Sequence, residues 1–192
     1  MAHKNIRDAL SSFEQFEDKE WEKVAPLIEI KTFDKGEFYI QPGQYCQDIA
    51  FIEEGLFNYY YMIEGVKHIR QFFFYNNFMS NYPSFLSFQK SKSYIQALED
   101  SRITTISRNN LHKLYNSSMV WQSLGRKMAE RMYLTISEKH DSFLLDSPED
   151  RFLKLYSERP KVLMNVPQHM IASFIGVTPE ALSRIKKRLF NK

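Results

Sequence analysis

The sequence has a single cysteine, no long hydrophobic run and no cluster of histidines. Cys46 alone cannot form a disulfide within the chain, and it cannot by itself hold an iron–sulfur cluster or a structural zinc ion. The first ten residues, MAHKNIRDAL, are polar, and no run of about 18 apolar residues follows them. We therefore expect a soluble, unexported, cytoplasmic protein that makes no contact with a membrane.

The residues that most enzymes need are also missing from any recognisable arrangement. No His-x-His pair or neighbouring carboxylate suggests a metal site on a cupin-like barrel, and the five histidines are scattered: His3, His68, His112, His140 and His169. There is no nucleophile–base constellation and no Gly-rich phosphate loop. A haem sensor would need an axial ligand, and the isolated His68 and Cys46 have no supporting motif. We expect a protein that is not an enzyme and that binds no metal or cofactor.

The charge is unevenly distributed along the chain, although its total is only +3. Residues 147–192 contain nine Lys or Arg against four Asp or Glu, a net charge of +5, which leaves −2 for the rest. A basic end on a mildly acidic body suggests that the C-terminus meets a polyanion, although a basic helix face is often simply solvated.

The first part of the chain is rich in short β segments separated by Gly, Pro and Asn. Alternating aromatic, β-branched and polar residues are typical of half-buried strands, and they recur in EIKTF, FYIQP, IAFIEE, LFNYYYMI, VKHIRQFFFY, YIQALE and RITTIS. Many short strands at close spacing predict a sandwich or barrel. Before them, Ile6, Leu10 and Phe13 have helical spacing and indicate short helices that pack on this barrel.

A long helix is predicted from Ser117 to about Leu145, where there is no proline and only one glycine, Gly125. Its apolar residues recur at intervals of three and four, which indicates one continuous stripe: Trp121, Leu124, Met128 and Met132. Such a helix is longer than the barrel needs for cover, so we expect a seam with a second copy of the chain. The alternative is a helix that packs only on its own barrel. Ser147-Pro148-Glu149-Asp150 then ends the helix and starts another.

The last segment, QHMIASFIGVTPEALSRIKKRLF, has the spacing of a helix-turn-helix. Ala172 is small where two helices would approach closely, and Gly176 can leave the first helix with a positive φ at no Cβ penalty. The apolar wedge between the helices is predicted to consist of Ile171, Ile175, Val177, Leu182 and Ile185. Thr178-Pro179-Glu180 would start the second helix with a hydroxyl N-cap, a proline at the first position and an acid in the first turn.

Rotation by 100° per residue predicts two opposite faces of this second helix. Its polar face, which could enter a major groove, carries Glu180, Ser183, Arg184 and Lys187, with Pro179 at the start of the helix. Arginine suits the O6 and N7 acceptors of guanine, and glutamate accepts from the cytosine amino group. Contacts to DNA phosphates are expected from Gln168, His169, Thr178, Lys186, Lys187 and Arg188. Without the turn geometry, Glu180 and Arg184 would read as an ordinary surface ion pair.

The stretch FDKGEFYIQPGQYCQDIAFIEEGLFNYYY resembles the signature of cyclic-nucleotide-binding domains, in which a K-G-E turn, a P-G turn and a later glycine punctuate a β-roll. With the long helix and the terminal helix-turn-helix, nearly the whole chain resembles the catabolite activator protein/fumarate–nitrate regulator (Crp–Fnr) family. The resemblance implies a homodimer that binds a pseudo-palindromic operator, bends it and contacts RNA polymerase. It also aligns Glu180 and Arg184 with base-reading residues, while Pro179 replaces an arginine of some members.

The effector site departs from the family pattern. Members that bind cyclic nucleotides carry Gly-Glu for the ribose and Arg-Ser for the phosphate, whereas the aligned regions here read Phe78-Met79-Ser80-Asn81 and Ser91-Lys92-Ser93-Tyr94-Ile95. A buried phosphate needs a cation or converging donors, and only Lys92, in a polar run, offers one. Cyclic AMP is therefore disfavoured. The aromatic residues nearby either fill the roll as core or line a pocket for an apolar ligand: Phe72, Phe73, Phe74, Tyr75, Phe78, Tyr82, Phe85 and Phe88.

We expect an α+β chain in three parts: a cyclic-nucleotide-binding-like β-roll (jelly roll) at 1–115, a dimerisation helix at 116–146 and a (winged) helix-turn-helix domain at 147–192. The expected function is a sequence-specific DNA-binding regulator that acts as a homodimer. Its effector, if one exists, is a small molecule other than cyclic AMP, in a pocket near Asn81, Lys92, Ser93, Phe74 and Tyr82. The alternative is a ligand-sensing module whose C-terminal helices bind a protein partner.

Overall fold

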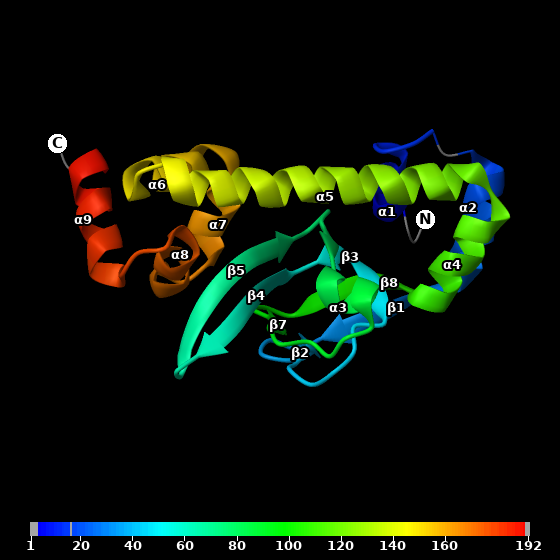
Figure 1. Ribbon diagram of the computed structural model, residues 1–192, viewed down its shortest axis with the longest axis horizontal. Coiled ribbons are helices and arrows are strands. Elements are labelled where there is room, and N and C mark those ends of the chain that lie inside the picture. The colour runs from blue at the N-terminus through cyan, green and yellow to red at the C-terminus, as the bar shows by residue number, and fades with distance from the viewer. Residues whose placement is uncertain (1–3, 16, 191–192) are drawn as a thin grey trace. The chain divides into compact units, whose positions relative to one another are not determined.

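The structure is a computed structural model that describes residues 4–15 and 17–190, and it contains the helices and two four-stranded sheets shown in Figure 1. The chain divides into two compact units. The N-terminal unit comprises the chain up to Tyr59 and Phe72–Arg131, and the C-terminal unit comprises Tyr60–Gln71 and the chain from Met132 onward. These units differ from the three consecutive parts expected from the sequence. The C-terminal unit includes Tyr60–Gln71 of the β-roll, and the boundary between the units falls within the long helix.

The strands predicted from alternation are present, with ends that differ by at most two residues. One sheet has the order β1-β8-β3-β6 and the other the order β2-β7-β4-β5, in which β5 is the edge strand. Their bounds are β1 Ile28–Phe33, β2 Phe38–Ile40, β3 Asp48–Glu54, β4 Leu56–Ile63, β5 Val66–Phe74, β6 Phe78–Met79, β7 Tyr94–Ala97 and β8 Ser101–Ser107. β1 pairs with β8 antiparallel, with Ile28 opposite Ile106. The mixed α+β class and the β-roll are therefore confirmed.

Helices precede the roll, interrupt it and follow it. Those of the N-terminal part are α1 Lys4–Ser11, α2 Asp18–Val24, the 3-10 turn η1 Ala25–Leu27, α3 Tyr82–Ser87 and α4 Arg108–Ser117. The long helix α5 spans Met119–Leu145 (Figure 1), and the C-terminal helices are α6 Pro148–Glu158, α7 Pro160–Asn165, α8 Gln168–Ile175 and α9 Pro179–Phe190. The helix-turn-helix is confirmed, but the elements described after residue 147 are all helices, so no strand of a wing is among them. In the described part of the chain, no helix is long and apolar enough to cross a membrane.

The start of α5 packs inside the N-terminal unit. Trp121 and Leu124 are each only 2% exposed, in a cluster with apolar residues of α1, α2, β3 and α4. The indole N–H of Trp121 donates to the buried Glu20 carboxylate at 2.8 Å. The expectation that Trp121 and Leu124 form a seam with a second copy is therefore corrected, because both are already covered by their own unit. Met128 packs partly against the same cluster, and Met132 is half-buried.

The C-terminal helices enclose a small apolar core of their own. Its buried side chains come from all four of these helices and the loop before α8: Phe152, Leu155, Val162, Val166, Ile171, Ala172, Ile175, Leu182 and Ile185. Most of the wedge predicted between the two last helices lies in this core. The burial of these side chains holds α8 and α9 together, since each fully buried aliphatic side chain contributes about 1.5 to 3 kcal/mol.

Candidate nucleic-acid interface

The turn between α8 and α9 is fixed by backbone geometry. Gly176 ends α8 with φ 76° and ψ 37°, the left-handed conformation that the sequence predicted. The next N–H, that of Val177, donates to the Ala172 carbonyl at 2.9 Å. A Cβ on Gly176 would also lie 2.7 Å from a ring carbon of Phe143. The positive φ therefore favours glycine here, and a larger residue would also have to displace the Phe143 ring.

Helix α9 begins with a side-chain cap. The Thr178 hydroxyl accepts from the Ala181 N–H at 3.2 Å, and the Thr178 carbonyl accepts from the Leu182 N–H at 3.0 Å. Hydrogen bonds from its own backbone N–H and from the Thr178 hydroxyl lower the pKa of Glu180, and Arg184 adds to the effect. Thr178 thus serves as the N-cap, and Glu180 carries its negative charge at neutral pH.

The polar face of α9 is exposed, as the rotation of the helix predicts. Glu180, Ser183, Arg184 and Lys187 are all solvent-exposed, whereas Leu182 and Ile185 on the opposite face are buried. Within the described part of the chain, neither Arg184 nor Lys187 forms an ion pair. These charged groups remain available for a partner outside the chain.

The residues expected to contact phosphates fall into two groups. Gln168 lies beside α9, where its side-chain oxygen accepts from Lys186 at 3.0 Å. A groove of about 340 Å³ lies beside α9. It is lined by Gln168, Pro179, Leu182, Ser183, Lys186, Lys187 and Phe190. His169 is exposed. Arg188 instead forms an ion pair with Glu149 of α6, so it could reach a phosphate only by releasing that carboxylate.

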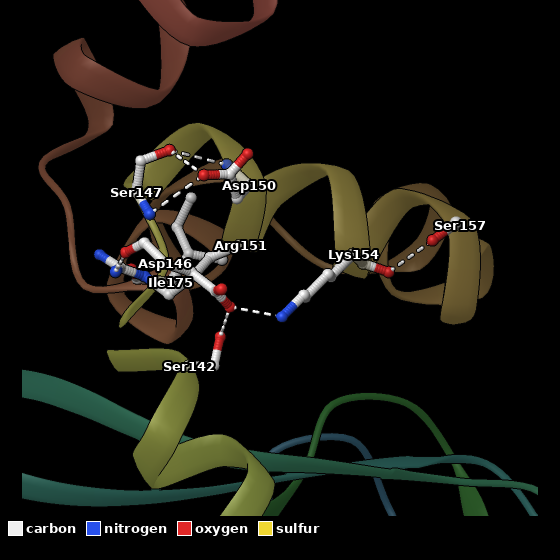
Figure 2. Close-up of polar contacts among 8 residues, drawn as sticks. All are labelled: Ser142, Asp146, Ser147, Asp150, Arg151, Lys154, Ser157 and Ile175. Atoms are coloured by element: carbon white, nitrogen blue, oxygen red, sulfur yellow. Dashed lines mark hydrogen bonds and ion pairs between the residues drawn. The ribbon is translucent and has the colours of Figure 1, made fainter. Parts of the chain in front are cut away.

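The junction between α5 and α6 positions α8, as Figure 2 shows. Ser147 and Asp150 form a capping box at the start of α6, which the sequence indicated only as N-cap chemistry. Arg151, in the first turn of α6, donates to the Asp146 carbonyl at 2.6 Å and to the Ile175 carbonyl at the end of α8 at 2.9 Å. One guanidinium therefore ties the end of α5 to the last turn of α8 (Figure 2).

A second attachment of α8 was not foreseen from the sequence. The Ser173 hydroxyl accepts from the Ile69 N–H at 2.9 Å and donates to the Lys67 carbonyl at 3.0 Å, both on β5. These contacts join positions more than 100 residues apart, and a serine on a helix gives no sequence signal for them. Because β5 is an edge strand, Ser173 takes the place of a neighbouring strand.

Lys139 of α5 completes this attachment. Its ammonium donates to the Arg70 carbonyl and lies 3.8 Å from the ring centroid of Phe174. Burial, followed by the positive charges of Arg159 and Arg70, lowers the pKa of Lys139 to about 7. The attachment therefore includes a lysine that changes its charge near neutral pH.

Two of the polar residues expected to bind an effector, Asn81 and Ser93, are instead hydrogen-bonded to each other. Asn81 is buried and caps α3, and its amide donates to the Ser91 and Ser93 hydroxyls at 2.6 and 2.9 Å. The same Asn81 side chain accepts from the Ser84 N–H at 3.3 Å. We call Asn81, Ser84, Ser91 and Ser93 the Asn81 cluster. Its polar groups bond to one another, so the cluster is satisfied without a ligand.

The other residues of the expected pocket add no hydrogen bond to the Asn81 cluster among the described residues. Lys92 is exposed, and Phe74 and Tyr82 are half-buried. Of the aromatic set, Phe72 and Phe85 are buried, and Phe73 and Tyr82 pack against the core of the roll, so much of the set acts as core. Tyr75 and Phe88 are exceptions, because they are 46% and 67% exposed.

The fold is that of known transcriptional regulators. It is similar to the cyclic di-GMP-responsive global regulator CLP of Xanthomonas campestris, with a TM-score of 0.66, 15% identity, and 90% of this chain and 91% of that chain covered. It is also similar to FixK2 of Bradyrhizobium japonicum (TM-score 0.70, 17% identity, 85% of each chain). For the catabolite activator protein of Thermus thermophilus the TM-score is 0.59 and the identity 15%, over 95% of this chain and 87% of that chain. No family model and no curated protein sequence matches the chain.

Proposed function

We propose that this protein is a transcriptional regulator of the Crp–Fnr type that reads double-stranded DNA through α9. The observation that carries the proposal is the exposed face of Glu180, Ser183, Arg184 and Lys187, held on a helix whose start, turn and packing are all fixed. Regulators named among the similar folds support the same function.

The chemistry of this face suits the edges of base pairs. Arg184 offers the planar fork that matches O6 and N7 of guanine, and Glu180 offers acceptors for a cytosine amino group. Lys187, with Gln168 and Lys186 beside it in the groove, suits phosphates, which fix the register of a protein on the duplex. Arg188 is the weakest phosphate candidate because Glu149 already holds it.

A homodimer would place two such faces on a pseudo-palindromic operator. Its support is the second half of α5, which carries large exposed apolar side chains. They are Tyr133, Leu134, Ile136, Leu144 and Leu145, each at least 49% exposed. A seam through these residues replaces the one expected at Trp121 and Leu124. DNA binding by such a dimer would serve transcription through contact with RNA polymerase.

Control by a small molecule other than cyclic AMP is part of the proposal. The ribose and phosphate of a cyclic nucleotide would have to displace hydrogen bonds that the Asn81 cluster already makes. No arginine stands in the family's phosphate position, and Lys92 faces solvent. An effector of this protein would therefore be a ligand of different chemistry.

The test is selection of preferred duplexes from a random library, followed by fluorescence anisotropy. Arg184→Ala should weaken binding to the selected site by about 1 to 3 kcal/mol and relax the preference at one base pair. Arg126→Ala removes the same charge from an exposed position on α5 and should leave binding unchanged. Failure to select any sequence, with both variants equal to the parent, would contradict the proposal.

A further inference from the structure

Arg108, at the first position of α4, is a buried cation with an unsatisfied guanidinium nitrogen in the described part of the chain. The residue is 9% exposed, and its Nη1 is buried without a hydrogen-bond partner in the described part of the chain. No carboxylate forms an ion pair with it there either. Burying a charged donor without a partner is unfavourable, so such a group needs a reason to be retained.

The guanidinium is covered by two aromatic rings. Its carbon lies 3.3 Å from the ring centroid of Phe88 and 4.9 Å from that of Phe85. Phe85 is buried, but Phe88 is 67% exposed and ends α3 with φ 57°, a left-handed conformation that a phenylalanine rarely adopts. An exposed ring in a disfavoured backbone conformation therefore forms the outer cover of a buried cation.

The surface around Phe88 is apolar and positively charged. Leu86 and Tyr45 are more than half exposed, and Lys90 lies 5.9 Å from the Tyr45 ring centroid. Lys90 and Lys92, in the loop that follows Phe88, are exposed and form no ion pair within the described residues. This combination attracts an anion and offers apolar contact to the rest of it.

We propose that Arg108 is the anchor of a binding site for a small organic carboxylate with an apolar body. Phe88 turns outward, the carboxylate takes the guanidinium fork, and the apolar body packs against Phe85 and Leu86. A carboxylate fits better than a phosphate, because a single buried guanidinium offers two parallel donors and balances one negative charge. The site adjoins the Asn81 cluster, because the Phe88 N–H donates to the Ser84 carbonyl at 3.1 Å, but it uses different side chains. It deepens the sensing part of the proposed function and does not depend on DNA binding.

The probe is benzoate, titrated by calorimetry into the full chain without DNA, with benzamide as the neutral counterpart of the same shape. The parent should bind benzoate saturably and benzamide not at all. Phe88→Ala removes the cover that competes for the cation, so benzoate should bind it about 3- to 30-fold more tightly. Arg108→Gln should bind at least about tenfold more weakly, and Arg108→Lys should fall between Arg108→Gln and the parent.

Equal binding of benzoate and benzamide, or benzoate binding that Arg108→Gln leaves unchanged, would overturn the site. If Arg108→Gln does not fold, the benzoate–benzamide difference in Phe88→Ala decides, and no saturable benzoate binding in that variant would also overturn it. Because the titration contains no DNA, these outcomes are independent of the selection experiment above.

Discussion

The Asn81 cluster and the exposed face of α9 both carry polar side chains. Those of the cluster are buried and hydrogen-bonded to one another, whereas those of α9 are exposed to solvent. In the cluster, the amide of Asn81 and the hydroxyls of Ser91 and Ser93 are buried and bonded to one another. On α9, Arg184 and Lys187 are exposed and form no ion pair in the described residues. The side chains of the cluster form their hydrogen bonds within the protein, whereas Arg184 and Lys187 can form theirs with another molecule.

The difference teaches that position in a family pattern does not decide which residues bind a ligand. The sequence alignment predicts that the cluster stands where family members hold their nucleotide, yet its side chains are hydrogen-bonded to one another. Buried polar groups that are satisfied stabilise a structure, and a ligand must first displace their bonds. Arg184 and Lys187 form no ion pair in the described residues that a partner would have to break, which suits them to the proposed contact with DNA.

The largest effect is expected from breaking the cluster. Asn81→Ala removes the donor to two buried hydroxyls and the cap of α3, and it should destabilise the protein by about 2 to 4 kcal/mol. Urea unfolding measures this change. Asn165→Ala, which alters an exposed asparagine of α7, should cost less than about 0.5 kcal/mol.

The same measurement addresses cyclic AMP. If the cluster is closed to ligands, cyclic AMP should leave the unfolding midpoint of the parent unchanged. A saturable rise of the midpoint with cyclic AMP, lost in Asn81→Ala, would show instead that the cluster opens to bind the nucleotide.

Lys139 sharpens the comparison, because it is a half-buried lysine in the C-terminal unit whose ammonium is already held by a backbone carbonyl. Its pKa is about 7 in the folded protein and about 10.5 ordinarily, so between these values the unfolded chain binds more protons. Stability should therefore rise with pH from about 7 to 9.5, by at most about 1.4 kcal/mol per pH unit. Below pH 7 both states carry the proton, and Lys139 adds no slope.

Urea unfolding at a series of pH values up to 9.5, before most tyrosines ionise, gives the slope. Lys139→Met should flatten it, whereas Lys161→Met, at an exposed position on α7, should keep it. Equal slopes in the parent and Lys139→Met would mean that the ammonium is well solvated.

The smallest effect is expected at Lys187. Lys187→Ala should weaken binding to all duplexes about equally and reduce the slope of log affinity against log salt concentration by about one. Lys113→Ala, an exposed lysine of α4, is the charge-matched control and should leave the slope unchanged. A slope that is the same in Lys187→Ala and the parent would remove Lys187 from the phosphate contacts.

Local patterns predicted the elements of this fold well. Alternation located the main strands, Gly176 marked the turn of the helix-turn-helix, and Ser147 marked the start of α6. These signals work because strand faces, positive φ and helix caps depend on a few neighbouring residues. The short helices α3 and α7 were missed, since six residues carry too little periodicity to be recognised.

Contacts between distant segments could not be predicted in the same way. Trp121 has the spacing of a dimer stripe, and only the position of α1 and α2 shows that it is covered. The bond of Ser173 to β5, the low pKa of Lys139 and the unpaired Arg108 likewise depend on residues far away in the sequence. The exposed residues of α9 were identifiable because exposure on a helix follows from its rotation alone.

The attachment of Ser173 to β5 has a consequence for solubility. An open strand at the end of a sheet presents N–H and C=O groups that can pair with a strand of another molecule and start aggregation. Ser173 occupies the N–H of Ile69 and the C=O of Lys67 on such a strand. The contact that holds α8 in place therefore also protects the sheet from edge-to-edge association. A chain in which α8 detaches would expose this strand edge and would be expected to aggregate.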